Sequence, residues 1–322
     1  MCPGWLSFLL ESALMGLVCA QRVAESKCQE YRRQTVIRTA IIPLVARPVP
    51  VFQEMFNCSP SAVEVIVGGV EAEEAEFPHQ ALIGWISSSS QPDADYEFLC
   101  GGTLISERFV LTAAHCSYAF ERGHPKVVRL GEHDLDNDLD HQVDVRIDQF
   151  ILHPEWRVKR AYHDLALVRL KRFVRFNPFI QPACLWTGNE INYTVAIATG
   201  FGQLGFLAPP SSKLIKVPLE LATAQQCNEI FPPDRRMPRG ISGGQLCAGS
   251  ADGRDTCKGD SGGPLQVKLE QTGCLYHVIG VTSRGQEACG YGQSFAIYTR
   301  ISAYVEWIEE VVWGDDDFWV WN

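Results

Sequence analysis

The chain is organised around Asp255-Thr-Cys-Lys-Gly-Asp-Ser-Gly-Gly-Pro264, which contains the candidate reactive residue Ser261. A serine hydroxyl becomes a useful nucleophile only where a base accepts its proton and nearby donors stabilise the oxyanion that forms. Gly259, Gly262 and Gly263 allow the backbone to turn tightly and to direct N–H groups toward one point. The pattern predicts a serine nucleophile, although an ordinary glycine-rich turn could have the same composition.

Two further segments supply the partners that such a serine needs. Thr112-Ala-Ala-His-Cys116 contains His115, and His163-Asp-Leu-Ala-Leu167 contains Asp164. Histidine has an unperturbed pKa of about 6.5, so it can accept and return a proton near neutral pH. A lone histidine is more often structural, but one that accompanies an acid and the Ser261 stretch is predicted to act in catalysis.

Composition excludes several function classes. The chain has 322 residues and is 46 % hydrophobic, so it can bury a large core. Its net charge is −10, and it has no extended run of Lys or Arg, so binding to DNA or RNA is not expected. Twelve cysteines without a zinc-binding spacing indicate disulfides formed in an oxidising compartment. No metal and no cofactor are predicted.

The first 20 residues are predicted to be a secretory signal peptide, which would make the protein extracellular. Trp5 to Ala20 is largely apolar and ends in Val18-Cys-Ala20, a small-residue cleavage site. No Lys or Arg precedes this stretch and Glu11 interrupts it, so a wrongly assigned or truncated start is the alternative. The stretch is too short and too interrupted for a membrane span, and no membrane association is predicted.

Residues 21–65 are predicted to be a propeptide that leans on the following domain. They show neither a helical period nor regular alternation, apart from the β-branched run Thr35–Ile42. From Ile66 onward, short alternating segments separated by Gly, Pro and Asp predict an all-β barrel or sandwich. The expected strands are Gln80–Trp85, Gly102–Ser106, Lys126–Leu130, Leu165–Leu170, Tyr193–Ala198 and His277–Thr282.

The end of the chain has a different pattern. Apolar residues at helical spacing between Ile301 and Val312 predict an amphipathic helix that docks on the domain. Residues 314–322 form an acidic and aromatic tail to which no role is assigned.

The order His115, Asp164, Ser261, together with Ile66-Val-Gly-Gly69, resembles the chymotrypsin/trypsin family of serine proteases. The resemblance extends to about Trp313 and implies two six-stranded antiparallel β-barrels with a C-terminal helix. It also implies that Asp164 fixes the His115 tautomer and that the N–H groups of Gly259 and Ser261 form the oxyanion hole. The implied reaction is hydrolysis of a peptide bond through an acyl-enzyme on Ser261.

The resemblance also implies where the substrate binds. Asp255 would lie at the base of the specificity pocket and select Arg or Lys. Ser283, Arg284 and Gly285 would pair with the substrate backbone, and Arg284 replaces a usual aromatic residue, which should weaken apolar selection and favour an acidic residue. Ala296 stands where the family commonly has Gly, so its methyl group should narrow the pocket.

Ile66 corresponds to the new N-terminus that the family releases when its zymogens are cut. The freed ammonium group would pair with Asp260 and order the pocket and the oxyanion hole. Val65 precedes the cut, which implies an activating protease of elastase-like or chymotrypsin-like specificity.

Ten cysteines are assigned to disulfides through the resemblance. One of the implied bridges, between Cys58 and Cys184, tethers the propeptide to the protease domain. Cys28 and Cys274 remain as the last pair. The other implied bridges are Cys100–Cys116, Cys227–Cys247 and Cys257–Cys289.

Within the family, Lys27-Cys-Gln-Glu-Tyr31 and Gly280-Val-Thr-Ser283 are similar to the arthropod clip-domain proteases. Residues 21–65 contain only two cysteines, too few for a clip domain, which was either lost or lies upstream of this chain. The similarity implies a secreted protease that acts on other zymogens in immune or developmental cascades, with an activating protease and a protein inhibitor as partners. A non-catalytic homologue that serves as a cofactor or decoy is one alternative, and a digestive protease is another.

Leu130-Gly-Glu-His-Asp134 begins a loop that binds calcium in some relatives. In register with the family, the later ligand positions fall on Leu139 and Gln142. A solvated acidic loop is therefore preferred over a calcium site.

Overall fold

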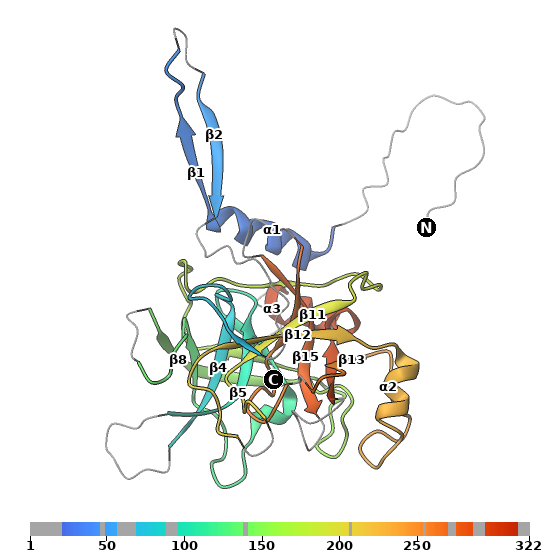
Figure 1. Ribbon diagram of the computed structural model, residues 1–322. Coiled ribbons are helices and arrows are strands. Elements are labelled where there is room, and N and C mark those ends of the chain that lie inside the picture. Colours follow the sequence, from blue (N-terminus) through green and yellow to red (C-terminus); the bar gives the residue numbers. More distant parts are fainter. Residues whose placement is uncertain are drawn as a thin grey trace, which may run out of the picture.

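The structure is a computed structural model in which two β-barrels lie together, with helices at their margins (Figure 1). The residues that it describes are 21–45, 49–56, 69–87, 96–137, 141–205, 208–253, 256–269, 275–285 and 294–314. Each barrel closes on itself through antiparallel pairings of six strands. The prediction of an all-β fold with two such barrels is confirmed.

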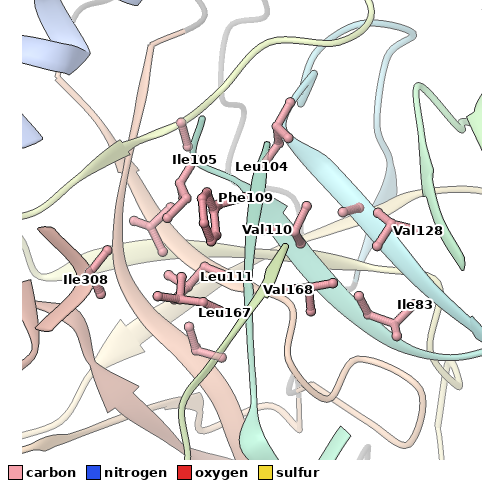
Figure 2. Packing of buried hydrophobic residues seen from close by; sticks show 14 of the residues in the cluster. Ile83, Leu104, Ile105, Phe109, Val110, Leu111, Val128, Leu167, Val168 and Ile308 are labelled. Atoms are coloured by element: carbon pink, nitrogen blue, oxygen red, sulfur yellow. The ribbon is translucent and has the colours of Figure 1, made fainter. Parts of the chain in front are cut away.

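In the first barrel, strands follow the order β4-β5-β6-β9-β8-β7. Their bounds are β4 Gln80–Ile86, β5 Tyr96–Leu104, β6 Phe109–Thr112, β7 Val127–Leu130, β8 Val143–Leu152 and β9 Ala166–Leu170. Ile83, Leu104, Val110 and Leu167 are completely buried and pack together in the centre of this barrel (Figure 2). Each such side chain contributes about 1.5–3 kcal/mol through its removal from water, so this core fixes the positions of the strand ends.

In the second barrel, strands follow the order β11-β12-β13-β16-β15-β14, and β14 pairs with β11. Their bounds are β11 Val195–Gly200, β12 Ile215–Leu221, β13 Gln245–Ser250, β14 Pro264–Lys268, β15 Tyr276–Gly285 and β16 Ser294–Arg300. Two short strands lie outside the ring: β3 (Val70–Glu71) pairs with β12, and β10 (Cys184–Leu185) pairs in parallel with β15.

The predicted C-terminal helix is present. After the short helix η2 (Ile301–Ala303), α3 (Val305–Trp313) buries Val305, Ile308 and Val311 at a spacing of three residues, which places them on one face. That face joins the core of the first barrel. One further helix, α2 (Ala224–Ile230), lies on the second barrel, and η1 (Ala114–Ser117) follows β6. None of the helices in the described ranges is long and apolar enough to cross a membrane.

The interpretation of residues 21–65 as lacking a helix was wrong, because residues 23–35 form α1 (Val23–Thr35). Ala24 and Tyr31 are each only 3 % exposed, and Cys28 between them forms a disulfide with the protease domain. These three residues are spaced four and three apart, which is one face of a helix. The rest of the helix is mainly polar, so the apolar residues of this narrow stripe are too few to reveal a helical period in the sequence.

The helix also changes one predicted disulfide. Cys28 is bonded to Cys184, with a Cα–Cα distance of 5.2 Å, and the predicted Cys58–Cys184 and Cys28–Cys274 bridges are therefore wrong. The reason is that α1 packs against β10, which carries Cys184. Cys58 and Cys274 lie outside the described residues. The segment before the protease domain is tethered to it as expected, but by a different cysteine.

The other cysteines follow the family pattern as far as they are described. The bridges Cys100–Cys116 and Cys227–Cys247 are present. Cys257 is also disulfide-bonded, and its expected partner Cys289 lies outside the described residues.

A hairpin follows α1 and projects away from the barrels (Figure 1). Its strands, β1 (Val36–Ile41) and β2 (Val51–Phe56), pair antiparallel along their whole length. Around its tip, Leu44 and Val49 are exposed to solvent. The hairpin agrees with the β-branched run of the sequence, and it contributes no residue to the site described next.

Candidate active site

Strand pairing in the first barrel brings His115 and Asp164 together. Thr112, the last residue of β6, pairs with Ala166, the first residue of β9. His115 lies on η1, three residues after Thr112, and Asp164 lies two residues before Ala166. Because antiparallel partners end at the same edge, both side chains emerge at that edge.

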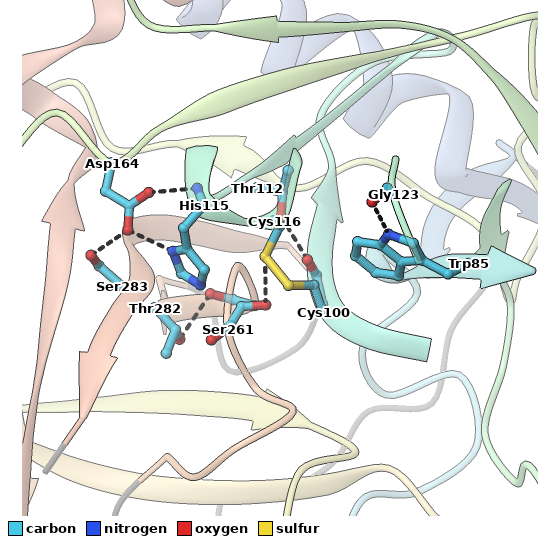
Figure 3. The surroundings of a disulfide bond; sticks show 12 residues. Trp85, Cys100, Thr112, His115, Cys116, Gly123, Asp164, Ser261, Thr282 and Ser283 are labelled. Atoms are coloured by element: carbon cyan, nitrogen blue, oxygen red, sulfur yellow. Dashed lines mark hydrogen bonds and ion pairs between the residues drawn. A yellow bond between two sulfur atoms is a disulfide. The ribbon is translucent and has the colours of Figure 1, made fainter. Parts of the chain in front are cut away.

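The Asp164 carboxylate organises the site (Figure 3). Its Oδ2 atom lies 2.7 Å from His115 Nδ1 and accepts a hydrogen bond of 2.6 Å from the Ser283 hydroxyl. Its Oδ1 atom accepts a hydrogen bond of 2.9 Å from the backbone N–H of His115. With Nδ1–H donated to Asp164, the other nitrogen of the ring, Nε2, is left as a proton acceptor.

His115 and Asp164 each stabilise the charged form of the other. Burial alone would raise the pKa of Asp164, but the charge of His115 and the hydrogen bonds from His115 and Ser283 outweigh it and lower that pKa. Burial alone would lower the pKa of His115, but the Asp164 carboxylate outweighs it and raises that pKa above its ordinary value. Asp164 is therefore an anion that stabilises the imidazolium formed when His115 accepts a proton.

The backbone before Asp164 is strained. His163 has a φ of +56°, a left-handed conformation that a side chain other than glycine rarely adopts. Its ring is held by Tyr304 OH at 3.2 Å and by Glu155 at 3.3 Å, and the carbonyl of Asp164 accepts a hydrogen bond from Thr299. These contacts fix the direction in which Asp164 points.

The Ser261 loop closes against the first barrel. The carbonyl of Ser261 accepts a hydrogen bond of 2.8 Å from the N–H of Gly101 and lies 3.7 Å from the sulfur of Cys116, the neighbour of His115. Gly262 has a φ of +79°, and a Cβ there would lie 2.2 Å from the hydroxyl of Thr112, so only glycine fits. Figure 3 shows Ser261 beside the His115 ring, on the side away from Asp164.

The backbone N–H groups at and beside Ser261 differ in whether a described residue accepts a hydrogen bond from them. Gly262 and Gly263 donate their N–H groups to Thr282 and Asp260. By contrast, within the described ranges no residue accepts a hydrogen bond from the N–H of Gly259 or of Ser261. These two N–H groups are the ones assigned to the oxyanion hole from the sequence, and they are available to stabilise a developing negative charge.

Asp260 is a partly buried carboxyl group beside Ser261. It accepts hydrogen bonds from the N–H groups of Gly202 at 2.8 Å and Cys257 at 2.9 Å. Burial nevertheless raises its pKa to about 6. No cation among the described residues pairs with it. Val65 and Ile66, assigned to activation, lie outside the described residues.

The residues assigned to the specificity pocket are described in part, because Asp255 lies outside the described residues. Gly285 and Ala296 are direct partners across β15 and β16, and a Cβ on Gly285 would lie 3.3 Å from the carbonyl of Thr256. The Thr256 hydroxyl lies 3.0 Å from Tyr298 OH. Thr256 and Tyr298 were missed by the sequence interpretation, although Thr256 directly follows Asp255.

The structure adds partners for two residues of the substrate-binding strand. Ser283 was assigned to the substrate backbone alone, yet its hydroxyl also holds Asp164. Arg284 donates from Nη1 to Asp234 Oδ2 at 2.8 Å, an ion pair between β15 and the segment after α2. No sequence signal connects positions 234 and 284, because they meet only in the folded chain.

The acidic loop after β7 uses its own carboxylates internally. Glu132 pairs with Arg129 at 3.2 Å and accepts hydrogen bonds from the N–H groups of His133 and Asp134. Asp134 in turn accepts hydrogen bonds from Asp136 and Asn137. Residues 138–140 lie outside the described residues.

Cysteine and histidine ligand atoms lie close together at two places in the described ranges. These clusters are the Cys28–Cys184 disulfide with His277 and the Cys100–Cys116 disulfide with His115. Disulfide sulfurs are not the thiolates that bind metals.

The fold and the site together define a serine hydrolase with two β-barrels and a histidine–aspartate pair beside a nucleophile loop. The family model described as Trypsin matches residues 66–308. The chain therefore belongs to the trypsin family of serine proteases, which are serine-type endopeptidases.

Known proteins support this assignment. "Serine protease snk" of Drosophila melanogaster is 40% identical over 295 residues, which are 91% of this chain and 66% of that protein. "CLIP domain-containing serine protease B4" of Anopheles gambiae is 33% identical and covers 91% of this chain and 82% of that protein. The structure is similar to neuropsin, a serine protease expressed in the limbic system of mouse brain, with a TM-score of 0.62 and 28% identity over 76% of this chain and 98% of that chain. The resemblance to arthropod clip-domain proteases is thus confirmed.

Proposed function

We propose that this chain is the zymogen of a secreted serine endopeptidase that cleaves after Arg or Lys in other zymogens of an extracellular cascade. The main support is the arrangement at Asp164, which holds the His115 ring in one tautomer next to the Ser261 loop. Its disulfides support secretion, because such bonds persist in oxidising compartments. The cascade role rests on the resemblance to clip-domain proteases.

In the proposed reaction, Ser261 Oγ attacks the carbonyl carbon of the scissile bond while His115 Nε2 takes its proton. The N–H groups of Gly259 and Ser261 stabilise the oxyanion, each contributing about 3 kcal/mol to the transition state. His115 then passes the proton to the leaving amine, which departs and leaves an acyl group on Ser261. Water, deprotonated by His115, attacks the acyl group. The bond to Ser261 Oγ then breaks, and His115 returns the proton to that oxygen. Asp164 stays ionised throughout.

Selection of Arg or Lys is assigned to Asp255. A carboxylate at the base of a narrow pocket is costly to desolvate unless a cation pairs with it, so neutral side chains are disfavoured. Thr256, Gly285 and Ala296 support a pocket next to it, because they come together from three separate segments. The methyl group of Ala296 should narrow this pocket and slow turnover of large side chains.

The proposed activation switch is the Asp260 carboxyl. Its raised pKa reflects burial without a cationic partner in the described part of the chain. A new N-terminal ammonium group at Ile66 would supply that partner and favour the ionised carboxylate. Cleavage between Val65 and Ile66 would then order the neighbouring Gly259 N–H and the pocket.

The test uses the full chain with residues 61–65 exchanged for Asp-Asp-Asp-Asp-Lys, which allows a tag-removing protease to cut before Ile66. The cut protein should react with a fluorophosphonate probe, and the uncut protein should react far more slowly. The Ser261→Ala variant, cut in the same way, should not react. A folded, cut protein that the probe does not label would instead identify a non-catalytic cofactor or decoy.

Substrate choice is tested separately with peptides that differ only in the residue before the scissile bond. Arg and Lys peptides should be cleaved at least about tenfold faster than Gln or Leu peptides, because the pocket carboxylate would have no cationic partner with the latter. Equal rates would refute the role of Asp255 while leaving the hydrolytic activity in place. General degradation of casein would favour a digestive protease, whereas cleavage confined to zymogens would support the cascade role.

A further inference from the structure

Segments 155–162, 231–240 and 283–285, beside the active site, carry seven cationic side chains that take no part in the proposed proton transfers. Arg157 donates to the carbonyls of Pro154 and Trp156 in its own segment. We call the other six the cationic rim: Lys159, Arg160, Arg235, Arg236, Arg239 and Arg284. The only carboxylates on segments 155–162, 231–240 and 283–285 are Glu155 and Asp234. The whole chain has a net charge of −10, so the rim is a local excess of positive charge on an acidic protein.

Three segments that are far apart in sequence form this rim. The N–H of Ala161 donates to the carbonyl of Arg236 at 3.2 Å, and Arg160 donates to the carbonyl of Arg235. The Arg239 guanidinium lies 4.9 Å from the centre of the Tyr162 ring. The ion pair between Arg284 and Asp234 connects both segments to β15. The three segments that carry the rim therefore lie side by side.

The rim lies directly beside the reacting groups. Arg284 follows Ser283, whose hydroxyl holds Asp164, and segment 155–162 leads into Asp164 through His163. The charge of Arg236 reaches the His115 ring, where it opposes protonation and so acts to lower the pKa of His115. A charged group on a bound substrate would therefore interact with the rim while its peptide bond lies at Ser261.

Among the described residues, Arg284 is the one rim cation with an ionic partner, and three of the other five also lack a hydrogen bond and a ring contact. Lys159, Arg235 and Arg236 are exposed, and their charged groups form no hydrogen bond, ion pair or ring contact with a described residue. The two carboxylates nearby are already paired, Glu155 with His163 and Asp234 with Arg284. These cations are free to pair with an anionic ligand.

We infer that the cationic rim binds acidic residues of the substrate on the N-terminal side of the scissile bond, so that the enzyme selects proteins with an acidic stretch before the cleaved Arg or Lys. This inference rests on the proposed function. A polypeptide fits better than a free polyanion, because the rim adjoins Ser283–Gly285, the part of β15 assigned to the substrate backbone. A substrate held by that strand would carry its upstream residues past Arg284 and Arg236.

The test measures kcat/KM for the cut full chain on matched peptides that end in Arg before a fluorescent leaving group. One peptide carries Asp and Glu at three upstream positions, and the reference carries Asn and Gln there. The acidic peptide should be cleaved about tenfold faster at low salt, the effect of two or three exposed ion pairs, and the advantage should shrink as salt screens them.

Two triple variants make the test specific. Lys159→Gln with Arg235→Gln and Arg236→Gln should reduce the preference for the acidic peptide to about twofold or less, because the free cations are gone. The matched control is Lys171→Gln with Arg172→Gln and Arg175→Gln. This control removes the same exposed charges at the opposite end of β9, about 17 Å along the strand, and should keep the full preference.

Each alternative result has a definite meaning. Equal rates for the two peptides, or a preference that survives in the rim variant, would overturn the inference. If the rim variant lost binding to a sulfated polysaccharide while the two peptides were cleaved equally, the rim would be a polyanion site. Labelling of Ser261 by the fluorophosphonate probe separates these outcomes from failure of the proposed function, because an unlabelled protein would cleave neither peptide.

Discussion

The active site and the attachment of α1 both join distant parts of the chain, but their contacts are distributed differently. At the active site, three donors converge on one carboxylate, that of Asp164. Along α1, the contacts are spread over the helix: a disulfide at Cys28, hydrogen bonds at Tyr31, and a backbone hydrogen bond from Ala24 to Glu309.

This difference predicts which substitutions matter for activity and which for stability. Where contacts converge on one group, a single change should abolish function and leave the fold intact. Where contacts are spread, each substitution should remove only part of the free energy that holds α1 on the protease domain, and catalysis should be unaffected. Variants in the two regions should therefore have opposite effects on activity and on the stability of α1.

The largest effect is expected from Asp164→Asn. The amide side chain has the same shape but favours the wrong tautomer of His115, so kcat should fall about 10⁴-fold, as is typical for this change in serine proteases. Hydrogen exchange of α1 should match that of the parent, since Asp164 makes no contact with the helix. If the substitution accelerated amide exchange in α1 as much as it accelerated exchange around Asp164, the two regions would be coupled.

The next effect is expected from Cys28→Ser combined with Cys184→Ser. The disulfide closes a loop with a sequence separation of 156 residues, and its removal should cost about 2–5 kcal/mol of unfolding free energy. Urea unfolding measures this loss, and fast amide exchange in residues 23–35 would localise it to α1. The kcat value for a neutral peptide should stay within about twofold of the parent's.

A smaller effect is expected from Tyr31→Phe. Its hydroxyl donates to Glu107 at 3.0 Å and accepts from the indole N–H of Trp313 at 3.2 Å. Loss of both hydrogen bonds, with the ring retained, should cost about 1–2 kcal/mol. Tyr162→Phe, which removes a hydroxyl bonded at Gly240 and Arg239, is a control outside α1. If both variants changed amide exchange in α1 equally, the Tyr31 hydrogen bonds would not be specific to the attachment of α1.

The smallest effect near neutral pH is a pH dependence of the α1 attachment. A ring nitrogen of His277 lies within 4.8 Å of the sulfurs of Cys28 and Cys184, and burial lowers its pKa to about 4. The unfolded chain, with a histidine pKa of about 6.5, binds more protons between pH 6.5 and 4, so stability should fall as the pH decreases through this window.

The matched variants for this pH dependence are His277→Gln and His79→Gln. His79 is buried away from α1 in contact with Gln266, and its pKa is also lowered to about 4. His277→Gln should flatten the pH dependence of amide exchange in α1, while His79→Gln should flatten only that of global unfolding. If amide exchange in α1 depended on pH equally in His277→Gln and in the parent, protonation of His277 would not be what weakens the attachment of α1.

The candidate catalytic residues could be proposed from the sequence because the chemistry restricts the residue types. A serine nucleophile requires a base and donors, and those requirements left recognisable motifs at His115, Asp164 and Ser261. The second role of Ser283 left no such mark, because any residue near a carboxylate can supply a hydroxyl. The ion pair of Arg284 with Asp234 was invisible for the same reason.

The disulfide at Cys28 shows the limit of inference by family. Two cysteines upstream of the protease domain were candidates for Cys184, and the family pattern favoured Cys58. The choice was made by α1, whose short apolar stripe places Cys28 against β10. Packing of a mostly polar helix depends on a few contacts with a surface that the sequence alone does not display.

The sequence predicted an all-β fold and three candidate catalytic residues, because alternating strands and reactive side chains obey local rules. Its motifs also identified the family, and the resemblance to that family implied two barrels. Contacts between distant segments set which cysteine holds the N-terminal segment, which hydroxyl supports Asp164, and which cations lie on adjoining segments. Such contacts depend on which surfaces meet when the chain folds, and pairs of residues tens of positions apart carry no local pattern that reveals it.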